Sequence, residues 1–74
     1  MNNLEQHIEV IIFTASEPVT AEFIGEMVSQ IHGRDIGRDV VVGAVEKINQ
    51  RYESIHSVFK IFNIAGGYQL LTKK

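Results

Sequence analysis

The residues of this chain that could do chemistry are scattered and form no catalytic or metal-binding pattern. Histidine occurs at positions 7, 32 and 56, and none of the three lies four residues from another histidine or a carboxylate. Metal sites and general-base pairs need such clustering. The sequence contains no cysteine, so a thiol nucleophile, a disulfide framework and a thiolate zinc site are all excluded. We therefore expect His7, His32 and His56 to be structural or solvated.

The serines and glycines give no better support for catalysis. The serines are not in the context of a nucleophile elbow; they are Ser16, Ser29, Ser54 and Ser57. The spacing of Gly33 and Gly37, and the Gly66-Gly67 pair, do not match phosphate-binding loops, which need more glycines and a following helix. The sequence thus predicts a protein that is not an enzyme, with no cofactor, no metal and no small-molecule substrate. Binding remains as its function.

Composition limits where and how the chain acts. Its 74 residues predict one domain spanning 1–74, which must be stabilised by burial of its 45% hydrophobic residues. No apolar run approaches the roughly 20 residues that cross a bilayer, and no basic segment precedes an apolar N-terminus. We expect a cytoplasmic protein without a membrane partner.

Charge is distributed unevenly along the chain. Up to Gly33 there are five acids and no lysine or arginine, and from Arg34 onward there are seven bases against four acids, two of the bases being Lys73 and Lys74. The two parts therefore carry −5 and +3. Such asymmetry indicates a charged partner only weakly, because the basic excess is small.

Two helices are predicted in the first part of the chain. Asn3 and Gln6 have the spacing of a capping box, and an apolar stripe follows at helical spacing until Pro18 interrupts it. That stripe is Leu4, Ile8, Ile11, Ile12 and Ala15. Thr20 is predicted to cap a second helix. Its apolar stripe is Phe23, Ile24, Met27, Val28 and Ile31.

A third helix and a hairpin are predicted in the second part, after a polar loop over residues 32–39. The helix covers about residues 39–53, because apolar residues recur at helical spacing; they are Val41, Ala44, Val45, Ile48 and Tyr52. Residues 57–64 favour a strand, Gly66 and Gly67 a turn, and residues 68–72 a returning strand. Three helices followed by a hairpin predict an α+β winged helix-turn-helix domain, with the third helix in the recognition position and the hairpin as the wing.

A DNA-binding winged helix would use polar and basic residues of the third helix and the wing. The residues available for this are Arg38, Lys47, Gln50, Arg51 and Lys60. Glu46 and Gly43 share the exposed arc of the helix, where donors to DNA are needed, and phosphate contacts supply most non-specific affinity. A DNA-binding transcriptional regulator therefore remains as an alternative with a small supply of cations.

Apolar residues outside the stripes indicate a different surface. Phe13 lies opposite the stripe of the first helix, Val10 lies to one side of it, and Val42 projects away from the seam of the third helix. Two interpretations remain open for Val10, Phe13 and Val42. The wing or a neighbouring helix covers them, or they form an interface with another protein.

Four segments resemble one bacterial family. The chain opens with LEQHIEVIIF (residues 4–13), continues with SEPVT (16–20), carries Val45, Ile48, Asn49 and Tyr52 late in the third helix, and ends with IAGGYQLLT (64–72). In this order the segments are similar to the N-terminal domain of bacterial segregation and condensation protein B, which accompanies the SMC ATPase and its kleisin.

The resemblance implies a winged-helix adaptor in chromosome condensation and segregation, acting in the cytoplasm at the nucleoid. In this family the first of two winged-helix domains is associated with homodimerisation and the second with binding the kleisin. We therefore expect the chain to be the first of two such domains or a single-domain relative, with a second copy and SMC–kleisin subunits as partners. Gly66, Gly67 and Tyr68 are expected to form a structural wing motif, because glycine tolerates the positive φ of a tight hairpin.

Overall fold

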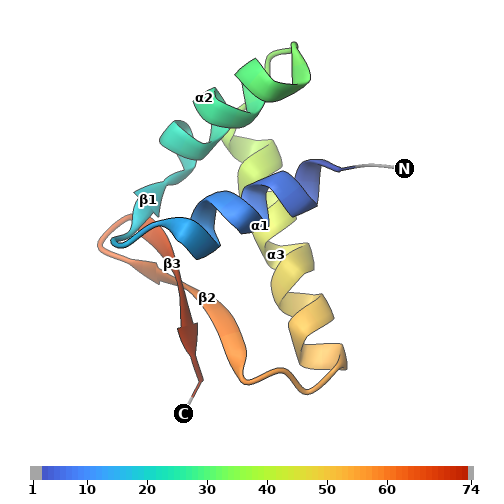
Figure 1. Ribbon diagram of the computed structural model, residues 1–74, viewed down its shortest axis with the longest axis vertical. Helices are drawn as coiled ribbons and strands as arrows, with labels where there is room; N and C mark the ends of the chain where they lie inside the picture. The colour runs from blue at the N-terminus through green and yellow to red at the C-terminus, as the bar shows by residue number, and fades with distance from the viewer. Residues whose placement is uncertain (1–2, 74) are drawn as a thin grey trace.

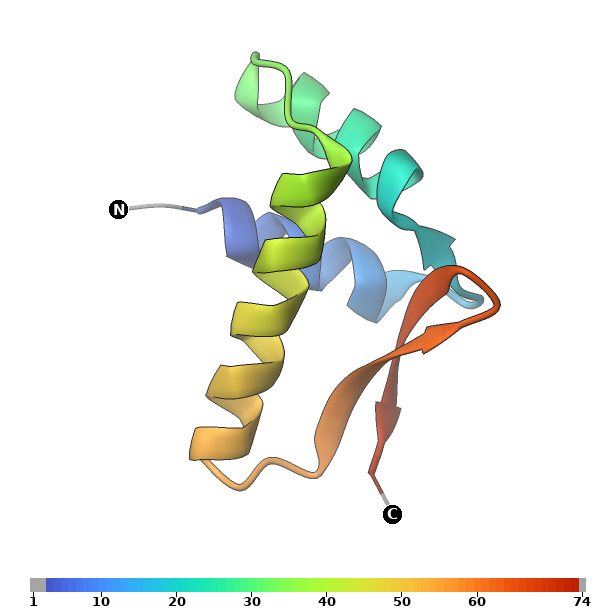
Figure 2. The same cartoon turned by 180° about the vertical axis from the view of Figure 1, so that it is seen from behind.

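The computed structural model describes residues 3–73 and confirms the winged-helix prediction (Figure 1). Three helices, α1 (Leu4–Thr14), α2 (Ala21–His32) and α3 (Arg38–Ser54), precede the wing formed by β2 (Phe59–Ile64) and β3 (Gly67–Thr72). A short strand, β1 (Val19–Thr20), lies between α1 and α2. Seen from behind, α3 runs downward from the connection that follows α2, with the wing at its side (Figure 2). Lys74 lies outside the described residues. No helix in the described range is long and apolar enough to span a membrane.

The core lies where the three helices meet the inner face of the wing. The helices contribute apolar residues at the expected spacing, and the wing contributes Ile61. The buried residues are Leu4, Ile8, Ile12, Ala21, Ile24, Val28, Ile36, Val41, Ala44, Val45, Ile48 and Ile61. The stripe predicted for the third helix is confirmed, with Tyr52 only partly buried against this cluster. The stripe predicted for the first helix is confirmed except at Ala15, which lies beyond the helix as its C-cap and outside the cluster, and Ile11 is only partly buried.

The second helix departs from its predicted stripe. Ile24 and Val28 are fully buried, but Phe23, Met27 and Ile31 are exposed. The predicted stripe is too wide for one side of the helix to bury, because Phe23 and Ile24 are about 100° apart around the helix axis. The side of α2 that closes the core instead uses Gly25, whose missing Cβ lets the carbonyl oxygen of Ile36 approach to within 3.0 Å of where that atom would be.

Capping explains the ends of α2. The Thr20 hydroxyl accepts a hydrogen bond from the N–H of Phe23 at 3.1 Å, as predicted, and Gly33 ends the helix with a left-handed φ of 67°. The predicted capping box of α1 is wrong. Asn3 makes no side-chain cap, and its backbone carbonyl accepts from the N–H of His7 instead.

The sheet has three strands, in the order β1–β3–β2, where the sequence predicted only a hairpin. Val19 pairs with Tyr68 and Thr20 with Gly67. The turn also lies one residue earlier than expected, at Ala65 (φ 51°) and Gly66 (φ 86°). Gly67 is therefore a strand residue. Its hydrogen faces Pro18, where a Cβ would lie 2.8 Å from the proline Cβ.

Candidate interaction surface

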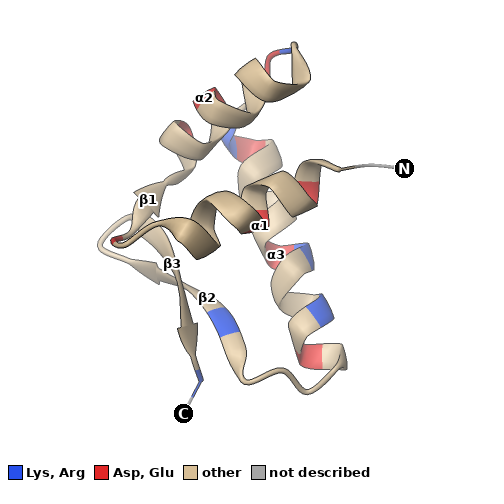
Figure 3. Ribbon diagram, viewed as in Figure 1, with Lys and Arg blue, Asp and Glu red and all other residues tan. Residues whose placement is uncertain are grey.

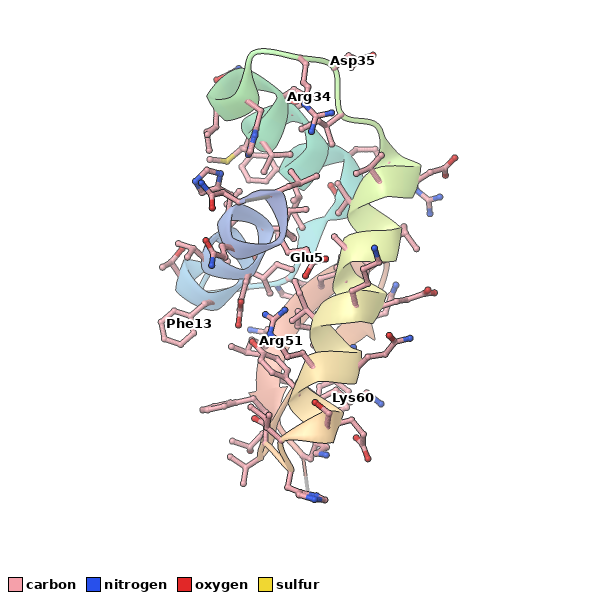
Figure 4. The ribbon with its side chains drawn as sticks, turned by 90° about the vertical axis from the view of Figure 1, so that its right-hand side faces the viewer. Glu5, Phe13, Arg34, Asp35, Arg51 and Lys60 are labelled. Atoms are coloured by element: carbon pink, nitrogen blue, oxygen red, sulfur yellow. The ribbon has the colours of Figure 1, made fainter. Side chains whose placement is uncertain are left out.

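The outer side of α1 carries two large apolar side chains with nothing over them. Val10 is 56% exposed and Phe13 is 65% exposed. Figure 4 shows Phe13 pointing away from the rest of the domain. Neither the wing nor another helix covers these residues, so one of the two interpretations left open by the sequence does not apply to them.

The exposed arc of α1 that carries Val10 and Phe13 contains no charged residue. At about 100° per residue, the exposed arc of α1 also contains Asn3, Gln6 and Thr14. The Thr14 hydroxyl donates to the carbonyl of Val10 at 2.8 Å, which satisfies its polar group within the helix. The arc thus offers apolar contact area with neutral polar groups beside Val10, and Glu9 borders it one turn before Phe13.

The acids of α1 flank this arc on the side toward α3. Arg51 spans both of them, with Nη1 3.2 Å from Glu5 Oε1 and Nη2 3.0 Å from Glu9 Oε1 (Figure 4). The Tyr52 hydroxyl donates a short hydrogen bond to Glu9. Burial and this bonded carboxylate together raise the pKa of Tyr52 to about 12, while nearby Arg51 lowers it. The network links α1 to α3, and Arg51 balances the negative charge at this edge of the arc.

Val42 agrees with the other interpretation left open by the sequence, in which the wing or a neighbouring helix covers it. It is only partly exposed and packs against the core cluster, whereas the helical wheel placed it away from the seam of α3. A helical wheel shows one helix by itself. In the structure, α3 is contacted by α1, α2 and the wing strand β2. Val42 is therefore separate from the arc that carries Val10 and Phe13.

The five residues predicted for DNA binding are not gathered into one basic face. Blue and red segments alternate along α3 in Figure 3. Arg38 pairs with Glu22 at 3.0 Å and Arg51 with Glu5 and Glu9, so two of the four cations already face carboxylates. Lys60 lies over the ring of Phe62, with Nζ 5.5 Å from the ring centre. Lys47 and Gln50 are exposed on α3.

Two of the three histidines bind each other. His7 Nδ1 lies 2.8 Å from His32 Nε2, and the rings meet edge to face with centres 4.9 Å apart. The pair joins α1 to the end of α2. His56 is exposed in the α3–β2 connection with a φ of 56°. Within residues 3–73, no three side chains of His, Asp or Glu gather as a metal site would need.

Sequence reasoning missed two residues that position the wing and α3. Asn49 on α3 binds both backbone groups of Ile61 on β2, at 2.9 and 3.0 Å. Ser29 on α2 accepts from the N–H of Ile36 at 2.8 Å and donates to the carbonyl of Gly25 at 2.6 Å, which fixes the loop before α3. The only sequence feature that could have pointed to either residue was Asn49 within the Ile-Asn-x-x-Tyr segment.

Comparison with solved structures agrees with this architecture. The crystal structure of a conserved hypothetical protein from Chlorobium tepidum is 34% identical, with a TM-score of 0.78 over 96% of this chain and 41% of that one. The crystal structure of ScpB from Mycobacterium tuberculosis is 14% identical and shares the fold, with a TM-score of 0.73 over 95% of this chain and 40% of that one. The chain thus spans about two fifths of the length of each.

Sequence comparison gives the family. No curated protein matches the chain. A family model, described as segregation and condensation complex subunit ScpB, matches residues 6–74. That match begins after Asn3 and Glu5, includes Val10 and Phe13 on α1, Arg51 on α3 and the whole wing, and the chain belongs to the ScpB family.

Proposed function

We propose that the protein is a non-catalytic interaction module that self-associates through α1 and acts as an accessory subunit of an SMC–kleisin complex in chromosome condensation and segregation. Membership of the ScpB family supports the process and the complex. Exposed Val10 and Phe13 carry the proposal of self-association. Action on the chromosome would place the protein in the cytoplasm, at the nucleoid.

The chemistry of the α1 arc favours a second copy as its occupant. Two copies that meet through this arc bury apolar side chains without bringing unpaired like charges together, because Glu5 and Glu9 at its edge are paired with Arg51. A twofold contact needs a self-complementary patch, and a neutral apolar arc on a single helix meets that requirement.

The bonding of His7 and His32 and the pKa of Tyr52 support a non-catalytic role. His7 and His32 bond to each other, and Tyr52 has a pKa raised further from neutrality, to about 12. A general acid or base works best with a pKa near the working pH, so Tyr52 is poorly suited to that task.

The test of self-association is sedimentation equilibrium of the wild-type chain and of Phe13→Asp. A charge at the centre of the arc should shift the mass from dimer to monomer while the circular dichroism spectrum stays helical. Ile55→Asp is the matched control, because Ile55 is 66% exposed against 65% for Phe13 and lies at the end of α3. If Phe13→Asp sediments with the same mass as the wild-type dimer, α1 is not part of the interface.

The alternative of a DNA-binding regulator has less support. Of its four cations, Arg38 and Arg51 would have to leave carboxylate partners before they could contact phosphates. Lys47 and Lys60 remain, which is a small number for an affinity that depends on phosphate neutralisation.

A further inference from the structure

A second apolar surface lies on α2. Phe23, Met27 and Ile31 recur at i, i+4 and i+8 and are 47%, 37% and 53% exposed. This spacing aligns them along one side of the helix for about 12 Å, or two turns. The length and composition match the seam that one amphipathic helix presents to another.

The stripe is presented on a rigid helix. The Thr20 cap and the left-handed Gly33 hold its two ends, and Gly33 N–H donates to the Ser29 carbonyl at 2.9 Å. Ser29 also ties α2 to the following loop through Ile36. A surface that is already ordered loses little conformational entropy when a partner binds.

Acidic residues border the stripe. The row one residue earlier on the helix is Glu22, Glu26 and Gln30, and all three are exposed. Glu22 pairs with Arg38, whereas Glu26 makes no ion pair within residues 3–73. Residues 4–33 contain no lysine or arginine. With Glu22 paired to Arg38, the negative charge of this edge lies on Glu26.

This charge distinguishes between occupants. If two copies packed α2 against α2 in antiparallel fashion about a twofold axis, the two acidic rows would lie along the same edge and repel. A partner helix with lysines or arginines beside its apolar face would meet the row favourably. The neutral α1 arc has no such preference, so the two surfaces suit different partners.

We propose that α2 binds a basic amphipathic helix of another protein through Phe23, Met27 and Ile31, with Glu26 contacting its cations. This surface is separate from the α1 arc proposed for self-association. The chain would then hold a second copy on one helix and a different protein on the next.

The probe is a synthetic amphipathic helix with leucines along one face and lysines flanking them, titrated onto the full chain by calorimetry. A control peptide carries glutamate in place of every lysine. The wild-type chain should bind the lysine peptide saturably and the glutamate peptide at least about tenfold more weakly. Equal affinity for the two peptides, or no saturable binding of the lysine peptide, would overturn the proposal.

Three variants place the binding site. Met27→Gln keeps the length and helix propensity of the side chain, and Glu26→Lys reverses the charge of the edge. Each should weaken binding of the lysine peptide about tenfold. Val10→Gln on α1 should leave the affinity for this peptide unchanged. Unchanged affinity in both α2 variants would contradict the proposal.

Sedimentation of the same variants separates this proposal from that of self-association. A loss of the dimer in Met27→Gln with an intact dimer in Val10→Gln would put the second copy on α2 and overturn the assignment of a basic partner. A wild-type chain that binds the lysine peptide through α2 but stays monomeric would contradict only the α1 proposal.

Discussion

The side-chain amide of Asn49 on α3 occupies the place that a neighbouring strand would have beside Ile61 on β2. Its Nδ2 donates to the Ile61 carbonyl at 3.0 Å, and its Oδ1 accepts from the Ile61 N–H at 2.9 Å. Ile61 is only 3% exposed, so both backbone groups would otherwise lie unpaired next to the core. One residue of the helix thereby holds the wing and covers the edge of the sheet at Ile61.

Replacement of Asn49 by leucine should destabilise the domain by about 1–3 kcal/mol, because a buried donor and acceptor lose their partners. Urea unfolding followed by circular dichroism measures this change. Hydrogen exchange should also accelerate at the Ile61 amide. Gln50→Leu, at the exposed neighbouring position, is the control and should change stability by less than about 0.5 kcal/mol. Equal effects of the two substitutions would mean that the two bonds contribute nothing.

Two glycine-to-alanine substitutions should change stability in opposite directions. At Gly67 the new Cβ would lie 2.8 Å from Pro18 Cβ and 3.1 Å from Pro18 C, so β1 must move, at a cost of about 1–3 kcal/mol. At Gly43, inside α3, nothing lies within 4 Å, and alanine should stabilise the helix by about 0.5–1 kcal/mol. Thermal unfolding of both variants checks this, and a Gly67→Ala chain as stable as the wild type would contradict the close β1–β3 packing.

Alkaline pH should weaken the α1–α3 contact through Tyr52. Its pKa is raised from 10.0 to about 12 in the folded chain, so the folded state favours the protonated phenol. This stabilisation is complete below pH 10, where the unfolded chain also keeps its proton, and it is lost as pH rises from about 10 to about 12. Free energies of unfolding measured across this range should fall with pH, and less steeply in Tyr52→Phe.

The cause of the raised pKa can be tested separately. The chain has two tyrosines, so Tyr68→Phe leaves Tyr52 as the only source of tyrosinate absorbance. In that background Glu9→Gln should lower the pKa of Tyr52, because the charged acceptor is removed, yet burial should keep it above 10.0. A pKa of Tyr52 that does not respond to Glu9→Gln would mean that the short hydrogen bond does not persist in solution.

The chain should bind DNA weakly. With Arg38 and Arg51 engaged by carboxylates, a mixed-sequence duplex should show no micromolar affinity in fluorescence anisotropy at about 50 mM salt. Tight binding at that salt that falls steeply by about 200 mM would instead favour the regulator function and direct attention to Lys47 and Lys60.

The sequence predicted the helices well because their apolar residues repeat at 3.6-residue intervals over several turns. The third helix was placed within one residue at each end, at Arg38–Ser54 against 39–53. The strand Val19–Thr20 was missed because two residues carry no periodicity. The turn was shifted by one residue because positive φ was assigned to both glycines, whereas Ala65 takes it and Gly67 is needed for its close contact with Pro18.

The surface was harder to predict than the core. A helical wheel shows which residues share a side, but not how much of that side the neighbours cover. Phe23, Met27 and Ile31 were therefore placed in the apolar stripe of the second helix although they are exposed, and Val42 was left open between cover and interface although it is partly buried against the core. The pairing of Arg51 with Glu5 and Glu9 joins residues more than forty positions apart, and no local pattern reveals it.

The most direct test of self-association through α1 is intermolecular paramagnetic relaxation. The chain contains no cysteine, so Glu17→Cys, just beyond α1, gives a single site for a spin label. The labelled chain is mixed with an isotope-labelled wild-type chain, and line broadening is read in the latter. We predict broadening concentrated on α1 around Val10 and Phe13. No broadening, or broadening confined to α2 or the wing, would contradict the proposed α1 interface.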